Sequence, residues 1–434
     1  MKAGAAILIA GLGTLAAAAA EPWTLDRALG FAQTNSPDAR IALQRVAAAQ
    51  AGIEQANSAV WPKLSLQSSY TRTDSPMMSF GNILNQRSYN YSSPINFNDV
   101  PATDDMNVRG VLTMPLYTGG KIAAEKHAAK AGSAAARQDA EAVRQTLAGE
   151  VARAFFTVQK TRQFIAAAES AITSYETNAA LARKRFDAGS ALRADVLDLE
   201  VRLAQAQEDL IRVRNAKALA QRALQNLLGR EEKEFSVADT APTLTAPAAG
   251  TLANRPESVA AAERSRAAEA QVRSAKSGYI PRVSAFGSLD YDYGWVMNGD
   301  GKSYTGGVML QWDLWDGRLT RAKVSEARSN LEAAREQERK VRLAVSLEAE
   351  QARLDLEQAQ QRLQVGEKTV AQAEESLSLT GRRFAEGAAL ATQLIDAQTA
   401  LTAARVRRAD ALADVQIATA ALRKALGLSI LETK

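Results

Sequence analysis

The sequence predicts an α+β membrane protein in which each chain supplies four β-strands and a set of very long α-helices. Three observations predict this fold class. The chain is a tandem duplication, each copy contains a helix-period run of about 65 residues, and two alternating apolar–polar segments precede each run. Four strands leave two open edges, which do not survive in lipid. We therefore expect a homotrimer that closes one twelve-stranded β-barrel, continued by a long coiled-coil α-helical barrel.

The first twenty residues have the pattern of a secretory signal peptide. Lys2 supplies a short positive region, an apolar stretch follows, and the alanines at 18–20 offer a small-residue cleavage site. The apolar stretch is shorter than the ~20 residues that a membrane-spanning helix needs. We therefore assign residues 1–20 to a signal peptide and expect the mature chain to leave the cytoplasm.

The internal repeat defines the organisation of the rest of the chain. Pro62 and Pro281 are separated by an offset of 219 residues, whereas the glycines Gly189 and Gly387 are separated by 198. The change of offset indicates an insertion in the first copy, in a Ser/Asn/Pro-rich segment at 73–105 whose composition predicts a loop. The predicted regions are a first repeat at 21–229, a linker at 230–253 and a second repeat at 254–434.

Each copy begins with a pair of helices, predicted at 25–34 and 37–60 in the first copy. Pro37 suits the first turn of a helix, where its missing N–H costs nothing. Pro62 then ends the second helix and stands at the first residue of a strand, where proline is tolerated. The second copy has prolines at both corresponding positions, so we expect the same arrangement there.

The predicted strands alternate between apolar and polar residues. In the first strand Leu64, Leu66 and Tyr70 share one face, and serine, glutamine and lysine occupy the other. The segments 107–116, 283–291 and 308–314 repeat this pattern over the length expected of a tilted membrane strand. A half-buried soluble sheet would show the same alternation, so the pattern of one strand alone does not decide between the two.

Aromatic residues gather at the strand ends next to the helices, as in the interfacial girdle of a membrane protein. The members of this girdle are Trp61, Tyr117, Tyr279, Trp312 and Trp315.

The long helical runs are predicted at 122–185 and 319–383, far longer than the helices of ordinary globular domains. Large apolar residues recur every seven positions in the second run, and small residues accompany them, which favours close coiled-coil packing. The large positions are Leu356, Leu363, Val370, Leu377 and Phe384. After each run a glycine ends the helix, and a return helix of about 38 residues begins. Each Arg-Phe-x-x-Gly segment is therefore the tip of an antiparallel helical hairpin.

The duplicated order of these elements resembles the TolC-type outer membrane efflux proteins over essentially the whole mature chain. The Pro-Leu-Tyr-Thr-Gly-Gly turn at 115–120 and the two Arg-Phe-x-x-Gly tips carry the resemblance. It implies a homotrimeric duct that starts in outer-membrane lipid and spans into the periplasm. It also implies two protein partners, a periplasmic adaptor at the tips and an inner-membrane transporter behind it.

The resemblance implies two functional sites, both near the tips. The predicted adaptor-docking residues are Arg185, Phe186, Gly189, Leu192, Arg383, Phe384, Gly387 and Leu390. The predicted pore constriction consists of Asp195, Asp198, Gln393 and Asp396. Gln393 stands where the family can carry aspartate, and Ala389 stands where it can carry a constriction arginine. Clustered carboxylates in a pore favour cations, although ordinary helix-surface acids would show the same spacing.

No residue pattern indicates an enzyme, a cofactor or a metal site. The chain has no cysteine, and its one histidine, His127, lies in a helical run. Basic residues are interspersed with acidic ones at a net charge of +5, so we expect no nucleic-acid partner. Three functions remain open: a passive channel for small molecules or ions, an outer-membrane channel for type I protein secretion, and a periplasmic coiled-coil structural protein without a pore.

Overall fold

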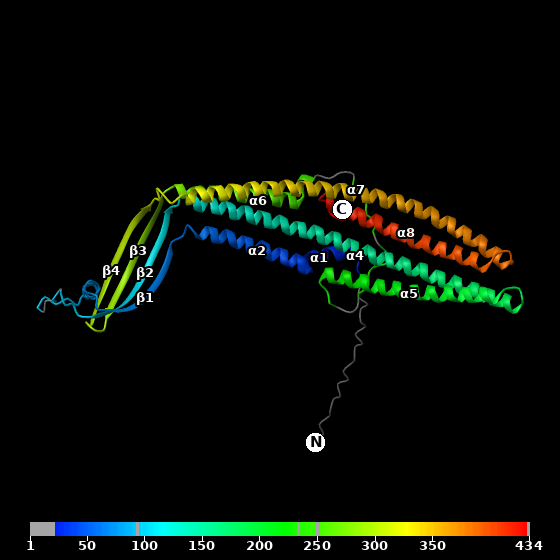
Figure 1. Cartoon of the computed structure of the whole chain (residues 1–434), viewed down its shortest axis with the longest axis horizontal. Coiled ribbons are helices and arrows are strands. Elements are labelled where there is room, and N and C mark those ends of the chain that lie inside the picture. The colour runs from blue at the N-terminus through cyan, green and yellow to red at the C-terminus, as the bar shows by residue number, and fades with distance from the viewer. Residues whose placement is uncertain are drawn as a thin grey trace, which may run out of the picture. The chain divides into compact units, whose positions relative to one another are not determined.

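The computed structural model describes residues 22–92, 95, 96, 98–231, 235–240, 242–247 and 252–431 (Figure 1). The predicted signal peptide lies outside these residues. The chain divides into two compact units, and each draws segments from both sequence repeats. One unit comprises residues 1–41, 143–252 and 346–434, and the other comprises residues 42–142 and 253–345. We refer to them as the hairpin unit and the sheet unit.

The order of elements follows the duplication. The helices of the first repeat are α1 (Leu25–Asn35), α2 (Pro37–Ser58), α3 (Pro76–Asn85), α4 (Lys121–Asp187) and α5 (Arg193–Leu228). Those of the second are α6 (Pro256–Lys276), α7 (Leu319–Ala385) and α8 (Ala391–Ala425), with short 3-10 turns at Leu252–Asn254 and Ser277–Tyr279. The strands are β1 (Lys63–Thr73), β2 (Thr103–Tyr117), β3 (Arg282–Gly294) and β4 (Gly299–Gln311). None of the described helices is both long and apolar enough to cross a membrane.

The core of the hairpin unit forms where α1 and the residues just before it meet the segment predicted as a linker. Trp23 forms a parallel β-bridge with Val237, and the guanidinium groups of Arg27 and Arg230 lie 4.6 and 5.2 Å from the Trp23 ring centroid. Phe155 of α4 is fully buried in the same cluster, together with leucines of α1 and α5. The described part of the linker therefore packs against the helices, although it has little regular structure of its own.

Two helical hairpins complete the hairpin unit. In Figure 1, α4 runs beside α5, and α7 runs beside α8. The predicted heptad stripe of α7 packs against α8, because Leu356 and its small neighbours share a buried cluster with Leu422. Helix α8 also contacts α4, where the Ser174 hydroxyl donates to the Gln398 amide oxygen at 2.7 Å. Because α8 contacts both α7 and α4, it joins the two hairpins.

The sheet unit contains one antiparallel sheet in the order β1-β2-β3-β4. The register sets Leu66, Gly110, Leu289 and Tyr304 in one row across all four strands, on an apolar face. The next row, Gln67, Arg109, Asp290 and Ser303, lies on the opposite, polar face. The alternation predicted for the strands is therefore confirmed.

The predicted element boundaries near the sheet need two corrections. The segment predicted as a loop at 73–105 contains α3, because Pro76 starts a helical turn and apolar residues follow at helical spacing. Strand β4 ends at Gln311, so Trp312 and Leu314 lie beyond the strand in which they were predicted. Pairing between β3 and β4 ends at the Arg282–Gln311 pair, whereas α7 begins at Leu319, the residue at which the long helical run is predicted to begin.

Side chains at equivalent positions of the two repeats cap the first turns of the long helices α4 and α7. The Thr118 hydroxyl accepts the backbone N–H of Ile122 at 3.4 Å, and the Asp316 carboxylate accepts that of Thr320 at 2.8 Å. The hydrogen bonds from Thr320 hold the pKa of Asp316 below its ordinary value. The helix is therefore capped by a hydroxyl in the first copy and by a carboxylate in the second. Both groups are common caps at helix N-termini.

Candidate functional site

Both predicted tips end their first helix with the same backbone arrangement. Gly189 and Gly387 have positive φ angles of 74° and 81°. At the first tip the backbone N–H groups of Gly189 and Ser190 donate to the carbonyls of Phe186 and Arg185 at 2.9 and 2.8 Å. The second tip repeats both bonds, which together form a Schellman motif. The glycines are therefore the positions at which each hairpin reverses.

Arg185 connects the two tips. Its Nη1 donates to the Phe384 carbonyl at 2.5 Å, and its guanidinium carbon lies 5.4 Å from the centroid of the Phe384 ring. An added Cβ at Gly387 would lie 2.9 Å from Nη2 of Arg185. The absence of a side chain at Gly387 therefore makes room for this contact. Sequence reasoning grouped Arg185 with the docking residues, and the structure shows that it binds the neighbouring hairpin.

The two phenylalanines of the tips have different environments. Phe384 is 3% exposed and packs in a cluster with residues of α4, α5 and α8, whereas Phe186 is 42% exposed. Leu192 and Leu390, which precede the return helices, are both exposed. The large apolar side chains exposed at the tips are therefore Phe186, Leu192 and Leu390, whereas Phe384 is buried.

Replacing Arg185 with alanine should loosen the contact between the tips without unfolding the hairpins. Hydrogen bonds from a charged group contribute about 1.5–3 kcal/mol, and the lost contacts all lie at the tip. We expect faster amide hydrogen exchange around Phe384 and Gly387, measured by mass spectrometry. Arg383→Ala is the matched control, because the hydrogen bond that Arg383 makes among the described residues is to the Ala388 carbonyl of its own tip. Equal exchange in both variants would contradict the proposed contact.

The predicted constriction residues divide into two pairs. The Asp195 carboxylate accepts the backbone N–H of Leu192 at 3.2 Å, and the Gln393 amide oxygen accepts that of Leu390 at 3.3 Å. Both residues thus hold the start of a return helix, a role for which aspartate and glutamine are interchangeable. Asp198 and Asp396 occupy equivalent exposed positions one turn later. All four predicted constriction residues lie close to the tip of their own hairpin. Asp198 and Asp396 do not cap a helix.

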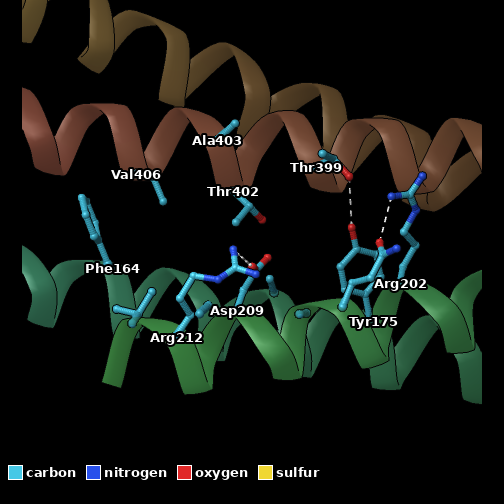
Figure 2. Close-up of a pocket in the computed structure, with 14 residues that line it drawn as sticks. Phe164, Tyr175, Arg202, Asp209, Arg212, Thr399, Thr402, Ala403 and Val406 are labelled. Carbon is cyan, nitrogen blue, oxygen red and sulfur yellow. Dashed lines mark hydrogen bonds and ion pairs between the residues drawn. The ribbon is translucent and has the colours of Figure 1, made fainter. Parts of the chain in front are cut away.

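Sequence reasoning did not identify a cavity of about 380 Å³ in the hairpin unit. Figure 2 shows it between α4, α5 and α8, with Phe164 and Val406 on its apolar side. The Tyr175 hydroxyl lies 3.2 Å from the Thr399 hydroxyl at one end, and Arg212 pairs with Asp209 near the other. Alanines of all three helices line the cavity. Their recurrence at helical spacing is the feature of the sequence that could have indicated a space between the helices. The remaining lining residues are Ala168, Ala171, Arg202, Gln205, Ala206, Val213, Thr402 and Ala403.

The predicted interface aromatics lie at one end of the sheet. Tyr117 ends β2, Trp312 follows β4, and Trp61 and Tyr279 precede β1 and β3. The strands are antiparallel, so these four positions share the sheet end that adjoins the helices. All four side chains and that of Trp315 are exposed, and the Trp312 indole N–H donates to the Tyr279 carbonyl at 3.2 Å.

Comparison with known proteins agrees with this architecture. The family described as "Outer membrane efflux protein" matches residues 28–230 and 250–428. Over 237 residues the chain is 26% identical to the outer membrane protein OprJ of Pseudomonas aeruginosa, an alignment that covers 51% of this chain and 50% of OprJ. The chain thus spans about half the length of that curated relative.

Two solved structures share the fold over almost the whole chain. The outer-membrane channel OprN superposes with a TM-score of 0.79 at 21% identity, covering 94% of this chain and 90% of OprN. The outer membrane protein VceC of Vibrio cholerae gives a TM-score of 0.79 at 21% identity, covering 94% of this chain and 97% of VceC. The family match covers both sequence repeats, so the chain belongs to the outer membrane efflux protein family, whose members are channel proteins of the outer membrane that extend into the periplasm.

Proposed function

We propose that this chain is the passive outer-membrane exit duct of a tripartite efflux system, and that three copies form one channel. The proposal rests on the open edges and the exposed apolar face of the four-stranded sheet. Its order leaves β1 and β4 without a further described strand, and its apolar face is exposed. An open sheet edge is excluded from lipid, whereas a closed ring of strands satisfies every backbone group. Three four-stranded sheets would close such a ring, with the apolar face toward lipid and the polar face toward water.

Exposed apolar residues on the long helices support the same assembly. Large side chains recur along α5 and α7 that nothing in the described part of a single chain covers. They are Leu197, Val201, Ile211 and Leu219 on α5, and Leu347, Leu354, Val365 and Leu379 on α7. Apolar side chains that recur on an exposed face of a helix favour packing against another protein surface. We expect these stripes to pack between neighbouring copies and to close the helical barrel.

We place adaptor docking at the tips. Phe186, Leu192 and Leu390 are exposed there, and the bends hold them at the ends of rigid hairpins. A partner that buries these side chains would gain hydrophobic stabilisation. We propose that the cargo is a small molecule or ion that an inner-membrane pump delivers through the adaptor.

The acids near the tips are proposed to tune the periplasmic opening. Replacing both Asp198 and Asp396 with asparagine should reduce the cation preference of the channel, because rings of carboxylates attract cations. The reversal potential in a salt gradient across a planar bilayer measures this preference. Asp187→Asn, an exposed acid at the end of α4, is the control. An unchanged reversal potential in the double variant would show that these acids do not line the pore.

Reconstitution tests the proposal as a whole. Purified protein should produce discrete conductance steps in planar bilayers, and a strain that lacks the chain should regain efflux when it is supplied. Protein that fractionates with the outer membrane but never conducts would favour the structural, non-pore alternative.

A further inference from the structure

A short segment of the first repeat folds onto the polar face of the sheet. We call residues 76–88, which comprise α3 and the three residues after it, the strap. Ser79, Ile83 and Gln86 are buried and follow one another at helical spacing, so one face of the strap is fixed to the sheet. Figure 1 shows it as the short blue helix beside the end of the strands.

Gln86 is the anchor of the strap. Its amide nitrogen donates to the Asp104 carbonyl at 2.6 Å and to the Asp105 carboxylate at 3.0 Å. About one helical turn before Gln86, the Asn82 side-chain amide donates to the Thr103 hydroxyl at 3.1 Å. All these partners lie at the start of β2. These hydrogen bonds of the Gln86 amide nitrogen favour one arrangement of the strap, because breaking buried hydrogen bonds is costly, although the buried Gln86 amide oxygen has no hydrogen-bond partner among the described residues.

Three glycines of the β3–β4 hairpin provide the space in which the strap sits. A Cβ at Gly294 would overlap the Gln86 side chain, one at Gly299 would overlap Ser88, and one at Gly301 would overlap the Asn85 carbonyl. The strand register places these glycines on the face of Asp292, the polar face. The glycines therefore leave the space that the strap occupies, and a Cβ at Gly299 or Gly301 would meet its backbone.

The strap thus lies on the side of the sheet that faces water in a closed barrel. Beneath it Asn107 donates to the Asp292 carboxylate at 2.8 Å, and Arg109 pairs with Asp290. Charged groups of this kind are excluded from the lipid-facing side of a membrane strand. The opposite face carries exposed leucines and tyrosine, which are suited to lipid. The strap therefore projects from the wall into the lumen.

The free side of the strap is apolar. Met77, Met78 and Leu84 are 82%, 55% and 49% exposed. Helix α3 carries no charged residue, and the one charged residue of the strap, Arg87, donates to the Lys302 carbonyl of its own chain at 3.3 Å. The exposed apolar side of α3 can therefore approach identical copies without bringing like charges together. We propose that the straps of three copies meet across the barrel axis and close its outer mouth through these side chains. This inference rests on the trimeric duct proposed above.

Disulfide trapping tests the contact between copies. The chain has no cysteine, so a single Met77→Cys variant can form disulfides only between chains. Oxidation with copper phenanthroline in isolated outer membranes should convert most of the protein to covalent dimers. Tyr91→Cys, an exposed position in the same loop region, is the control and should remain monomeric on denaturing gels. Equal yields for the two variants would overturn the proposed contact.

Labelling from outside the cell tests closure of the mouth. A single Thr305→Cys variant places a thiol on the polar face of β4, opposite Ser288. With the strap intact, a maleimide dye too large for general porins should label this thiol slowly. Adding Met77→Asp and Met78→Asp should raise the rate at least tenfold, because three charged copies repel one another. Gly81→Ala, whose new methyl group meets no neighbour, should leave the rate unchanged.

Measurements on the same membranes distinguish failure of this inference from failure of the proposed function. Trimers that conduct in bilayers but label equally fast with and without the charged strap would overturn the closure alone. Failure to find trimers would overturn both.

Discussion

A chain with valine at both Gly189 and Gly387 should reach the outer membrane as a trimer and export nothing. Both positions have positive φ angles, which β-branched residues adopt only with strain of order 1–3 kcal/mol each. The strain is confined to the tips, far along the chain from the sheet, so assembly should persist. The bends that present Phe186, Leu192 and Leu390 should be distorted. Drug-susceptibility assays in a strain that depends on this channel measure the loss, and heat-modifiable bands on gels report the trimer.

The two single variants should differ in severity. A side chain at Gly387 would also displace the Arg185 guanidinium, whereas a Cβ at Gly189 meets nothing within 4 Å. We expect Gly387→Val to impair export more than Gly189→Val. Asparagine at either position should preserve export, because it tolerates the left-handed conformation. Gly381→Ala, a helical position with free space close to the tip, is the neutral control. Normal export by the double valine variant would reject the docking role of the tips.

Phe155→Ala should destabilise the hairpin unit more than any substitution at its surface. Phe155 is fully buried where α1, α4, α5 and the linker meet, and its ring packs edge-to-face against Phe156 at 5.8 Å between centroids. Removing a buried phenylalanine side chain costs about 3–5 kcal/mol, since a cavity remains. Thermal unfolding of the detergent-purified protein, followed by circular dichroism, should show a clearly lower midpoint.

Phe164→Ala is the matched control for that substitution. Phe164 lies on the same helix but borders the cavity of Figure 2 and is only partly buried. Its loss enlarges an existing space and removes fewer contacts, so the midpoint should move less. A larger effect at Phe164 than at Phe155 would contradict the assignment of the core.

The order and type of the elements could be predicted because the signals are local and appear twice. In both copies a helix-period run that ends in Arg-Phe-x-x-Gly predicts a hairpin, and the constant offset aligns the two copies. The strand faces also followed from alternation, because one row of the sheet is apolar and the next is polar. Local propensity and tertiary structure agree in these segments.

The remaining features depend on contacts between distant segments. Phe186 and Phe384 occupy equivalent positions in the sequence, yet only Phe384 is buried, because the neighbouring hairpin covers it. Arg185 has a matching residue in Arg383, but only Arg185 reaches across to the other tip. The strap could not be predicted either, because the glycines that receive it lie about 200 residues away in the second repeat.

The central claim is that three copies make one channel, and native mass spectrometry of protein extracted from outer membranes in detergent tests it most directly. The account predicts a dominant species with three times the mass of the mature chain, stable after mild delipidation. A stable species with the mass of a single chain, soluble without detergent, would contradict it.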